Sequence, residues 1–89
     1  MTLRILSEPR ASRDVGDEIR RAIAGALPDA RIEVEGAGPG HFSIRVVSSA
    51  FAGQSRLRQQ QQVYGAIAHL MQGDSAPVHA IDRLLTEMP

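Results

Sequence analysis

IEVEGAGPGHFSIRVV, residues 32–47, is the stretch that decides the fold. Apolar residues alternate with polar ones in Ile32–Glu35 and again in His41–Val47, which is the pattern of two strands that each bury one face. The five residues between them, Gly36–Gly40, are three glycines, an alanine and a proline, a composition typical of a tight connection. The sequence therefore predicts an antiparallel hairpin at the centre of the fold.

A helical pattern lies on each side of this hairpin. The first begins near Asp14, with Ser12 or Asp14 suited to cap it, and ends at Pro28-Asp29. The second runs from Arg56 to about Gln72. The apolar positions expected to face the core are Val15, Ile19, Ile23, Ala26 and Leu27 in the first helix, and Leu57, Tyr64, Ile67, Leu70 and Met71 in the second.

The end of the chain supplies one more strand. Residues 78–85 form a short apolar run after the turn Gly73–Pro77, and residues 86–89 are expected to fray. Residues 1–12 lack a sustained period and are interpreted as a flexible lead-in or an added strand, which leaves 13–89 as the domain. The order helix, strand, strand, helix, strand predicts a small α+β fold with a three-stranded sheet and helices on one face.

Composition excludes several classes of protein. Ten arginines balance ten acidic residues in 89, with no lysine, so no net field attracts nucleic acid or an anionic membrane. Without cysteine there is no disulfide framework or thiolate nucleophile. No apolar run approaches the ~20 residues of a membrane span, and no signal peptide is evident, so we expect a cytoplasmic protein. No set of residues matches a catalytic arrangement, so the protein is not expected to be an enzyme.

The histidines are the best candidates for metal ligands. His79 follows the 73–77 turn at the head of the last predicted strand, and His41 leaves the glycine-rich loop at the first position of its strand. The alternatives are a hydrogen-bonded histidine at a strand start for His79 and an ordinary exposed loop residue for His41. His69 falls on the second helix, where a solvated or packing role is expected.

Two further features each have a purely structural and a functional interpretation. Gly36–Gly40 contains neither a phosphate-binding motif nor the G-x-x-G of nucleic-acid clamps, which favours a flexible connector. Arg56 and Arg58 oppose the dipole in the first turn of their helix, so they mark either an anionic partner or a plain solvated pair. Gln59–Gln62 fits a solvated helical face.

Three short motifs together resemble the signature of BolA-like proteins. They are the F-x-G-x-S turn of Phe51, Gly53 and Ser55, the pair Val63-Tyr64 in the helix, and His79-Ala80 at the last strand. The resemblance covers about residues 14–85 and implies a sheet arrangement like that of class II KH domains. Gln59–Gln61 or their neighbours stand where many members have an R-H-R triplet, so the chain is more similar to the Gln-bearing acid-stress branch of bacterial members. The Pro-acid-Trp ending of the family is only partly matched by residues 86–89.

The resemblance also implies a partner and a cofactor. BolA-like proteins pair with monothiol glutaredoxins around a [2Fe-2S] cluster, in iron homeostasis or stress response, and His79 and His41 match the family's ligand positions. Imidazole can replace thiolate on one iron, so this chain would supply nitrogen donors while the thiolates come from the partner and glutathione. Alone it should hold no cluster and be a monomer or weak homodimer.

The resemblance leaves two other functions open. Some members of the family are described as transcriptional regulators, so the alternative is a nucleic-acid-binding regulator that binds DNA through a KH-like surface. A third class is an adaptor that binds its partner without metal. The expected surface for a partner or nucleic acid is Arg56, Arg58, Gln59, Gln60 and Gln61.

Overall fold

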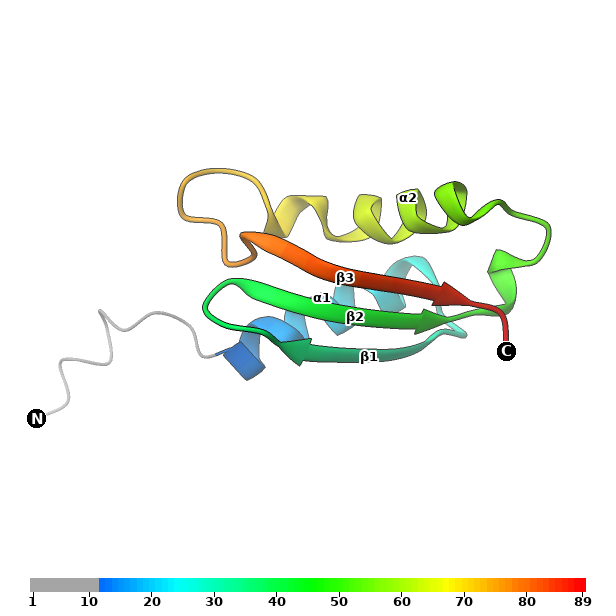
Figure 1. Cartoon of the computed structure of the whole chain (residues 1–89), viewed down its shortest axis with the longest axis horizontal. Helices are drawn as coiled ribbons and strands as arrows, with labels where there is room; N and C mark the ends of the chain where they lie inside the picture. Colours follow the sequence, from blue (N-terminus) through cyan, green and yellow to red (C-terminus); the bar gives the residue numbers. More distant parts are fainter. Residues whose placement is uncertain (1–11) are drawn as a thin grey trace, which may run out of the picture.

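The computed structural model describes residues 12–89, so the predicted lead-in 1–12 lies outside the described residues except for Ser12, which begins the first helix (Figure 1). The predicted order of elements is confirmed, with two short 3-10 turns added. The elements are α1 (Ser12–Ala26), β1 (Arg31–Gly36), β2 (His41–Val47), η2 (Ser49–Phe51), α2 (Arg56–Ile67), η3 (Ala68–Leu70) and β3 (Ala80–Glu87).

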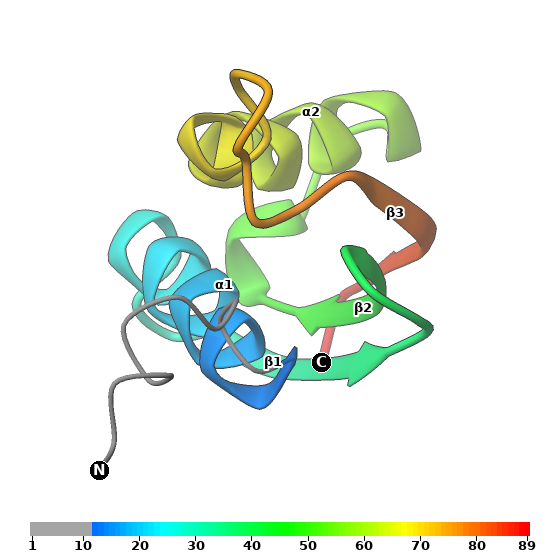
Figure 2. The same ribbon diagram turned by 90° about the vertical axis from the view of Figure 1, so that its left-hand side faces the viewer.

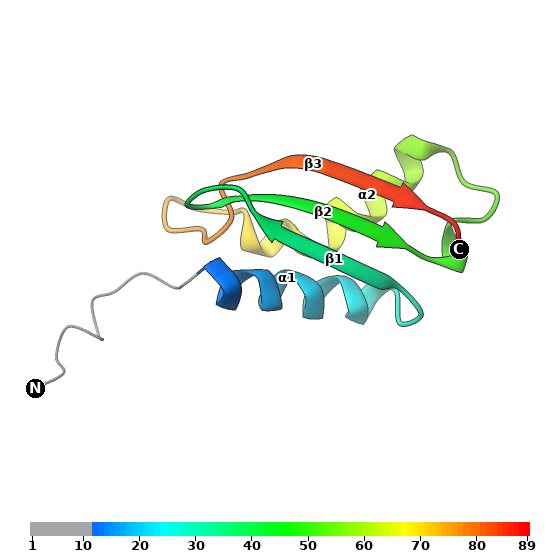
Figure 3. The same ribbon diagram turned by 60° about the horizontal axis from the view of Figure 1, so that its bottom comes forward.

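The three strands form one sheet in the order β1-β2-β3. β1 and β2 are antiparallel, as predicted, and Gly36 is already the last residue of β1, so the connecting loop is 37–40. β3 lies parallel to β2, which requires a long crossover, and α2 lies within it. Both helices cover the same side of the sheet (Figures 2 and 3), and the other side is open.

The core fills the space between the helices and the sheet. One face of β2 is buried, as are one stripe of α1 and one of α2. Most predicted core positions are confirmed, but Leu57 and Tyr64 are 63% and 40% exposed, and Ala26 is also exposed. Val63 is buried in place of Tyr64, because adjacent helical residues point about 100° apart. The buried apolar residues are Val15, Ile19, Ile23, Leu27, Phe42, Ile44, Val46, Phe51, Val63, Ile67, Leu70, Ala76 and Val78.

The F-x-G-x-S segment forms the turn that leads into α2. Phe51 is fully buried and anchors the segment in the core. Gly53 has a φ of +77°, a backbone conformation that glycine adopts without strain. The Ser55 hydroxyl accepts a hydrogen bond from the backbone N–H of Arg58 at 3.2 Å, so Ser55 caps the helix as predicted.

The C-terminal strand extends further than expected. β3 begins at Ala80 rather than Val78 and continues to Glu87, so the expected fraying of residues 86–89 is wrong at Thr86 and Glu87. The Thr86 side chain is buried and its hydroxyl donates to the Gln59 side-chain oxygen at 2.7 Å. The Gln59 amide donates in turn to the carbonyl oxygen of Gln54 at 3.0 Å. Gln59 therefore ties α2 to β3 and is half-buried, which corrects the expected solvated position, while its place in a partner surface stays a prediction.

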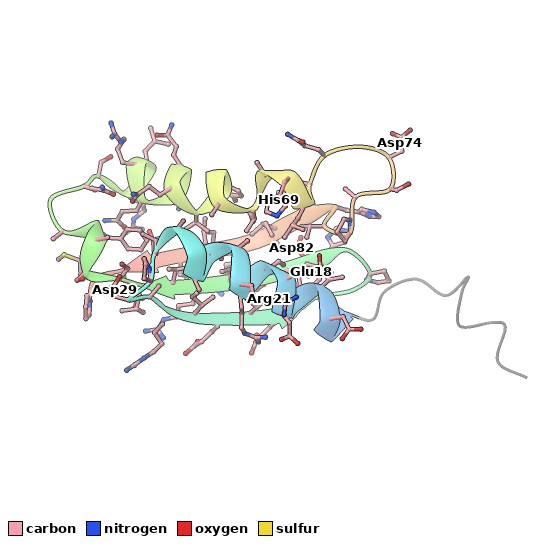
Figure 4. The ribbon with its side chains drawn as sticks, turned by 180° about the vertical axis from the view of Figure 1, so that it is seen from behind. Glu18, Arg21, Asp29, His69, Asp74 and Asp82 are labelled. Atoms are coloured by element: carbon pink, nitrogen blue, oxygen red, sulfur yellow. The ribbon has the colours of Figure 1, made fainter. Side chains whose placement is uncertain are left out.

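A carboxylate fastens the connection after α1 to the end of β2 (Figure 4). Asp29 accepts hydrogen bonds from the Ser48 hydroxyl at 2.8 Å, the Ser49 backbone N–H at 2.9 Å and the Ser49 hydroxyl at 2.7 Å. The Ser49 hydroxyl, followed by the Ser49 backbone and Ser48, lowers the pKa of Asp29 below its ordinary value.

This contact should make the fold sensitive to acid. Because the folded-state pKa of Asp29 is depressed, its contribution to stability is present above the unfolded-state pKa and is lost as the pH falls through the folded-state value. We expect Asp29→Asn to lower the unfolding free energy at neutral pH but to have little effect in strong acid, as measured by urea denaturation across the pH range. Asp74→Asn, at a loop carboxylate with no hydrogen bond among residues 12–89, is the control. An equal destabilisation by Asp29→Asn at every pH would contradict the proposed role.

No helix within residues 12–89 has both the length and the apolar character that crossing a bilayer requires.

Candidate functional site

The loop of the β1–β2 hairpin meets the start of β3 at one end of the sheet (Figure 1). The Gly40 carbonyl oxygen accepts two hydrogen bonds there, from the backbone N–H of His79 at 2.8 Å and from that of Ala80 at 3.1 Å. In the parallel pairing that follows, His41 is opposite Ala80. The fold therefore brings His41 and His79, which are far apart in the sequence, to adjoining backbone positions.

His79 lies just before β3 rather than inside it, which corrects the predicted start of the strand. Its side chain is exposed, and its imidazole lies against the backbone of Gly40, which has a φ of +75°. A Cβ atom on Gly40 would lie 2.8 Å from both Cγ and Nδ1 of His79, closer than atoms can pack. The ring nitrogens of His79 make no hydrogen bond with residues 12–89, so either is free to act as a donor to a metal.

His41 is held by a carboxylate of the neighbouring strand. Its Nδ1 atom is 2.9 Å from Oδ1 of Asp82, and both side chains are about half exposed. The other ring nitrogen, Nε2, has no partner among the described residues. Sequence reasoning identified His41 but missed both Asp82 and Gly40.

The donors at this end of the sheet do not complete a metal site. Within residues 12–89, no group of three or more histidine, cysteine, aspartate or glutamate side chains could hold a metal ion. A tetrahedral iron or zinc needs four ligands, so two exposed imidazoles leave coordination positions for donors from elsewhere. Among residues 12–89, the two imidazoles therefore do not form a complete metal site without donors from elsewhere.

The other predicted site residues lie elsewhere. Arg56 and Arg58 belong to the first turn of α2, at the end of that helix away from the loop that leads to His79 (Figure 1). Their side chains are exposed and have no partner in the part of the chain that the structure describes. Gln60 is half-buried and Gln61 is exposed. The structure therefore does not bring this arginine-bearing surface together with the two candidate ligands.

His69 is separate from the candidate ligands. It lies in η3, on the helix-covered side, and its exposed ring lines a groove with Glu18 and Arg21 of α1 (Figure 4). This position agrees with the solvated role expected for it.

A family model described as BolA-like protein matches residues 21–86. The chain belongs to the BolA-like family. A solved bolA protein homologue from Coxiella burnetii is 34% identical and has a TM-score of 0.66, and the match covers 82% of this chain and 88% of that one. Among curated proteins, none gives a significant match.

Two further solved structures support membership in the BolA-like family. The BolA1 protein from Mus musculus is 28% identical, with a TM-score of 0.69 over 92% of this chain and 71% of that one. The BolA domain of SufE1 from Arabidopsis thaliana is 27% identical, with a TM-score of 0.69 over 90% of this chain and 95% of that one. The assignment to the acid-stress branch and the likeness to class II KH domains stay predictions.

Proposed function

We propose that this BolA-like protein is a non-enzymatic partner of a monothiol glutaredoxin, and that the two proteins share a [2Fe-2S] cluster. The observation that carries the proposal is the pair of backbone hydrogen bonds from His79 and Ala80 to the Gly40 carbonyl, because they bring the exposed His79 and the half-exposed His41 to one end of the sheet. His79 is proposed as the main ligand and His41 as the second. Thiolates from the partner and from glutathione would occupy the remaining positions.

A bound cluster would supply one-electron redox chemistry, with a potential that rises when imidazole replaces thiolate. The protein's own part is to orient the donors. The Gly40 carbonyl fixes the backbone of His79, and the Asp82 carboxylate holds one ring nitrogen of His41. Such a protein would hold the cluster, relay it or sense it in the cytoplasm, in iron homeostasis or a stress response.

The assembly can be tested by mixing the purified chain with a monothiol glutaredoxin, iron, sulfide and glutathione. We expect a heterodimer with visible absorption that differs from that of the glutaredoxin alone, and no cluster on the isolated chain. The measurements are absorption and circular dichroism spectra together with sedimentation. A mixture whose spectrum is the sum of its separate parts, and which sediments as separate proteins, would refute the proposal.

A nucleic-acid-binding regulator is the second candidate, favoured by the unpartnered side chains of Arg56 and Arg58 on α2. On the open face of the sheet Arg45 is paired with Glu87 at 2.7 Å and with Glu33 at 3.3 Å, whereas the exposed Arg83 has no partner among residues 12–89. Salt separates the two candidates. Binding to a DNA duplex would weaken steeply as salt rises, whereas the cluster-bridged assembly depends on iron, sulfide and glutathione.

A further inference from the structure

An irregularity in β3 changes which side chains reach the open face of the sheet. The pairing with β2 runs from Phe42 opposite Ile81 directly to Ser43 opposite Arg83, so Asp82 is an extra residue in the ladder. Such a bulge breaks the alternation of a strand and redirects a side chain. As a result two successive residues of the strand, Asp82 and Arg83, are both exposed. Asp82 lies at this bulge, and its carboxylate contacts the His41 ring.

The chemistry of this contact fixes the proton on the imidazole. An ionised carboxylate can only accept a hydrogen bond, so at 2.9 Å from Asp82 Oδ1 the Nδ1 atom of His41 must carry the hydrogen. In the neutral ring Nε2 is then left with its lone pair. Nε2 is also the nitrogen that has no other partner among residues 12–89. The contact therefore selects one tautomer and presents one defined donor atom.

We propose that Asp82 is a positioning residue, which holds His41 in the Nδ1–H tautomer so that Nε2 is the donor offered to a metal centre. The assignment of His41 as a ligand rests on the proposed function, whereas the effect on its tautomer does not. Carboxylates commonly serve ligand histidines in this way, and losing one lowers metal affinity by about 10–100-fold.

The tautomer can be read in the isolated chain by long-range ¹H–¹⁵N correlation spectra at a pH of about 8, where an ordinary imidazole is neutral. The wild-type protein should show a protonated Nδ1 and an unprotonated Nε2 at His41. Asp82→Ala should lose this preference. Asp82→Asn should weaken it, because the amide oxygen can accept from Nδ1–H but the amide NH2 can also donate to an unprotonated Nδ1. Asp74→Ala, which removes an exposed carboxylate from the loop before β3, should resemble the wild type (Figure 4).

A His41 spectrum that is the same in Asp82→Ala as in the wild-type protein would overturn the proposal. The proposal would also be overturned if Asp74→Ala lost the tautomer preference as Asp82→Ala does, because the effect would then come from the removal of a negative charge alone. Asp82→Asn also guards against misfolding, since it conserves shape at the bulge. If Asp82→Ala does not fold, Asp82→Asn provides the test, and a tautomer preference equal to that of the wild-type protein would overturn the proposal.

The mixed assembly with glutaredoxin supplies a second measurement. Asp82→Ala should lose the cluster to a chelator at about 10–100-fold lower concentration than the wild-type protein, and Asp82→Asn should be intermediate. If His41→Ala weakened the cluster and Asp82→Ala did not, the positioning role of Asp82 would be contradicted but the proposed function would not. If neither His41→Ala nor His79→Ala affected the cluster, the proposed function would fail, while the tautomer result would remain as its own test of the Asp82 contact.

Discussion

Replacing His79 with alanine is expected to abolish the cluster signature of the mixed assembly. The His79 imidazole lies where the hairpin loop meets β3 and makes no hydrogen bond with residues 12–89. An alanine side chain has no atom that could bind a metal there. The assembly made with His79→Ala should therefore show the absorption and circular dichroism of the glutaredoxin's own cluster, or none. The measurement is reconstitution of the two purified proteins followed by visible spectroscopy.

The fold should tolerate this substitution, which makes the result interpretable. The His79 side chain is exposed, and its backbone N–H, which donates to Gly40, is kept in alanine. Exposed substitutions of this kind usually change the unfolding free energy by less than about 0.5 kcal/mol. His69→Ala is the matched control, because it removes an exposed imidazole from η3. A wild-type spectrum from His79→Ala would mean that the protein serves as an adaptor or a regulator instead.

The hairpin and the first helix were predictable because their patterns are local. Alternation in β2 and spacings of three and four in α1 each report on a single buried face. The second helix was harder, because Val63 and Tyr64 are adjacent and both apolar, and only tertiary packing decides which one is buried. Gln59 shows the same limit, since a glutamine in a helix is ordinarily solvated but here bonds to Thr86.

The candidate ligands could be predicted, but the residues that orient them could not. His41 and His79 stand at strand starts that sequence patterns indicate. The contact of Asp82 with His41 depends on β3 lying beside β2 and on the register between them, which a local sequence pattern does not reveal. Gly40 is one of three glycines in this segment, and what distinguishes it is tertiary: the hydrogen bonds from His79 and Ala80 to its carbonyl and the His79 ring against its backbone.

Gly40→Ala is expected to damage both stability and the candidate site. A φ of +75° strains a residue that has a Cβ atom, and the new atom would lie 2.8 Å from the His79 ring. The backbone strain should cost about 1–3 kcal/mol, as measured by urea denaturation. The ring cannot stay in place while the N–H of His79 remains bonded to the Gly40 carbonyl, so it must rotate away. We expect the mixed assembly to lose at least about tenfold in affinity for the cluster, by chelator competition.

Gly53→Ala separates strain from contact. Gly53 has nearly the same φ, +77°, but a Cβ atom there would meet nothing within 4 Å. Gly53→Ala should therefore lose stability through backbone strain, as Gly40→Ala does, and leave the cluster unaffected. In a double-mutant cycle, Gly40→Ala should cost less in a His79→Ala background than in the wild type, because most of the clash is with the ring that has been removed. An equal cost in both backgrounds, together with a cluster unchanged by Gly40→Ala, would show that Gly40 serves only the turn and does not position His79.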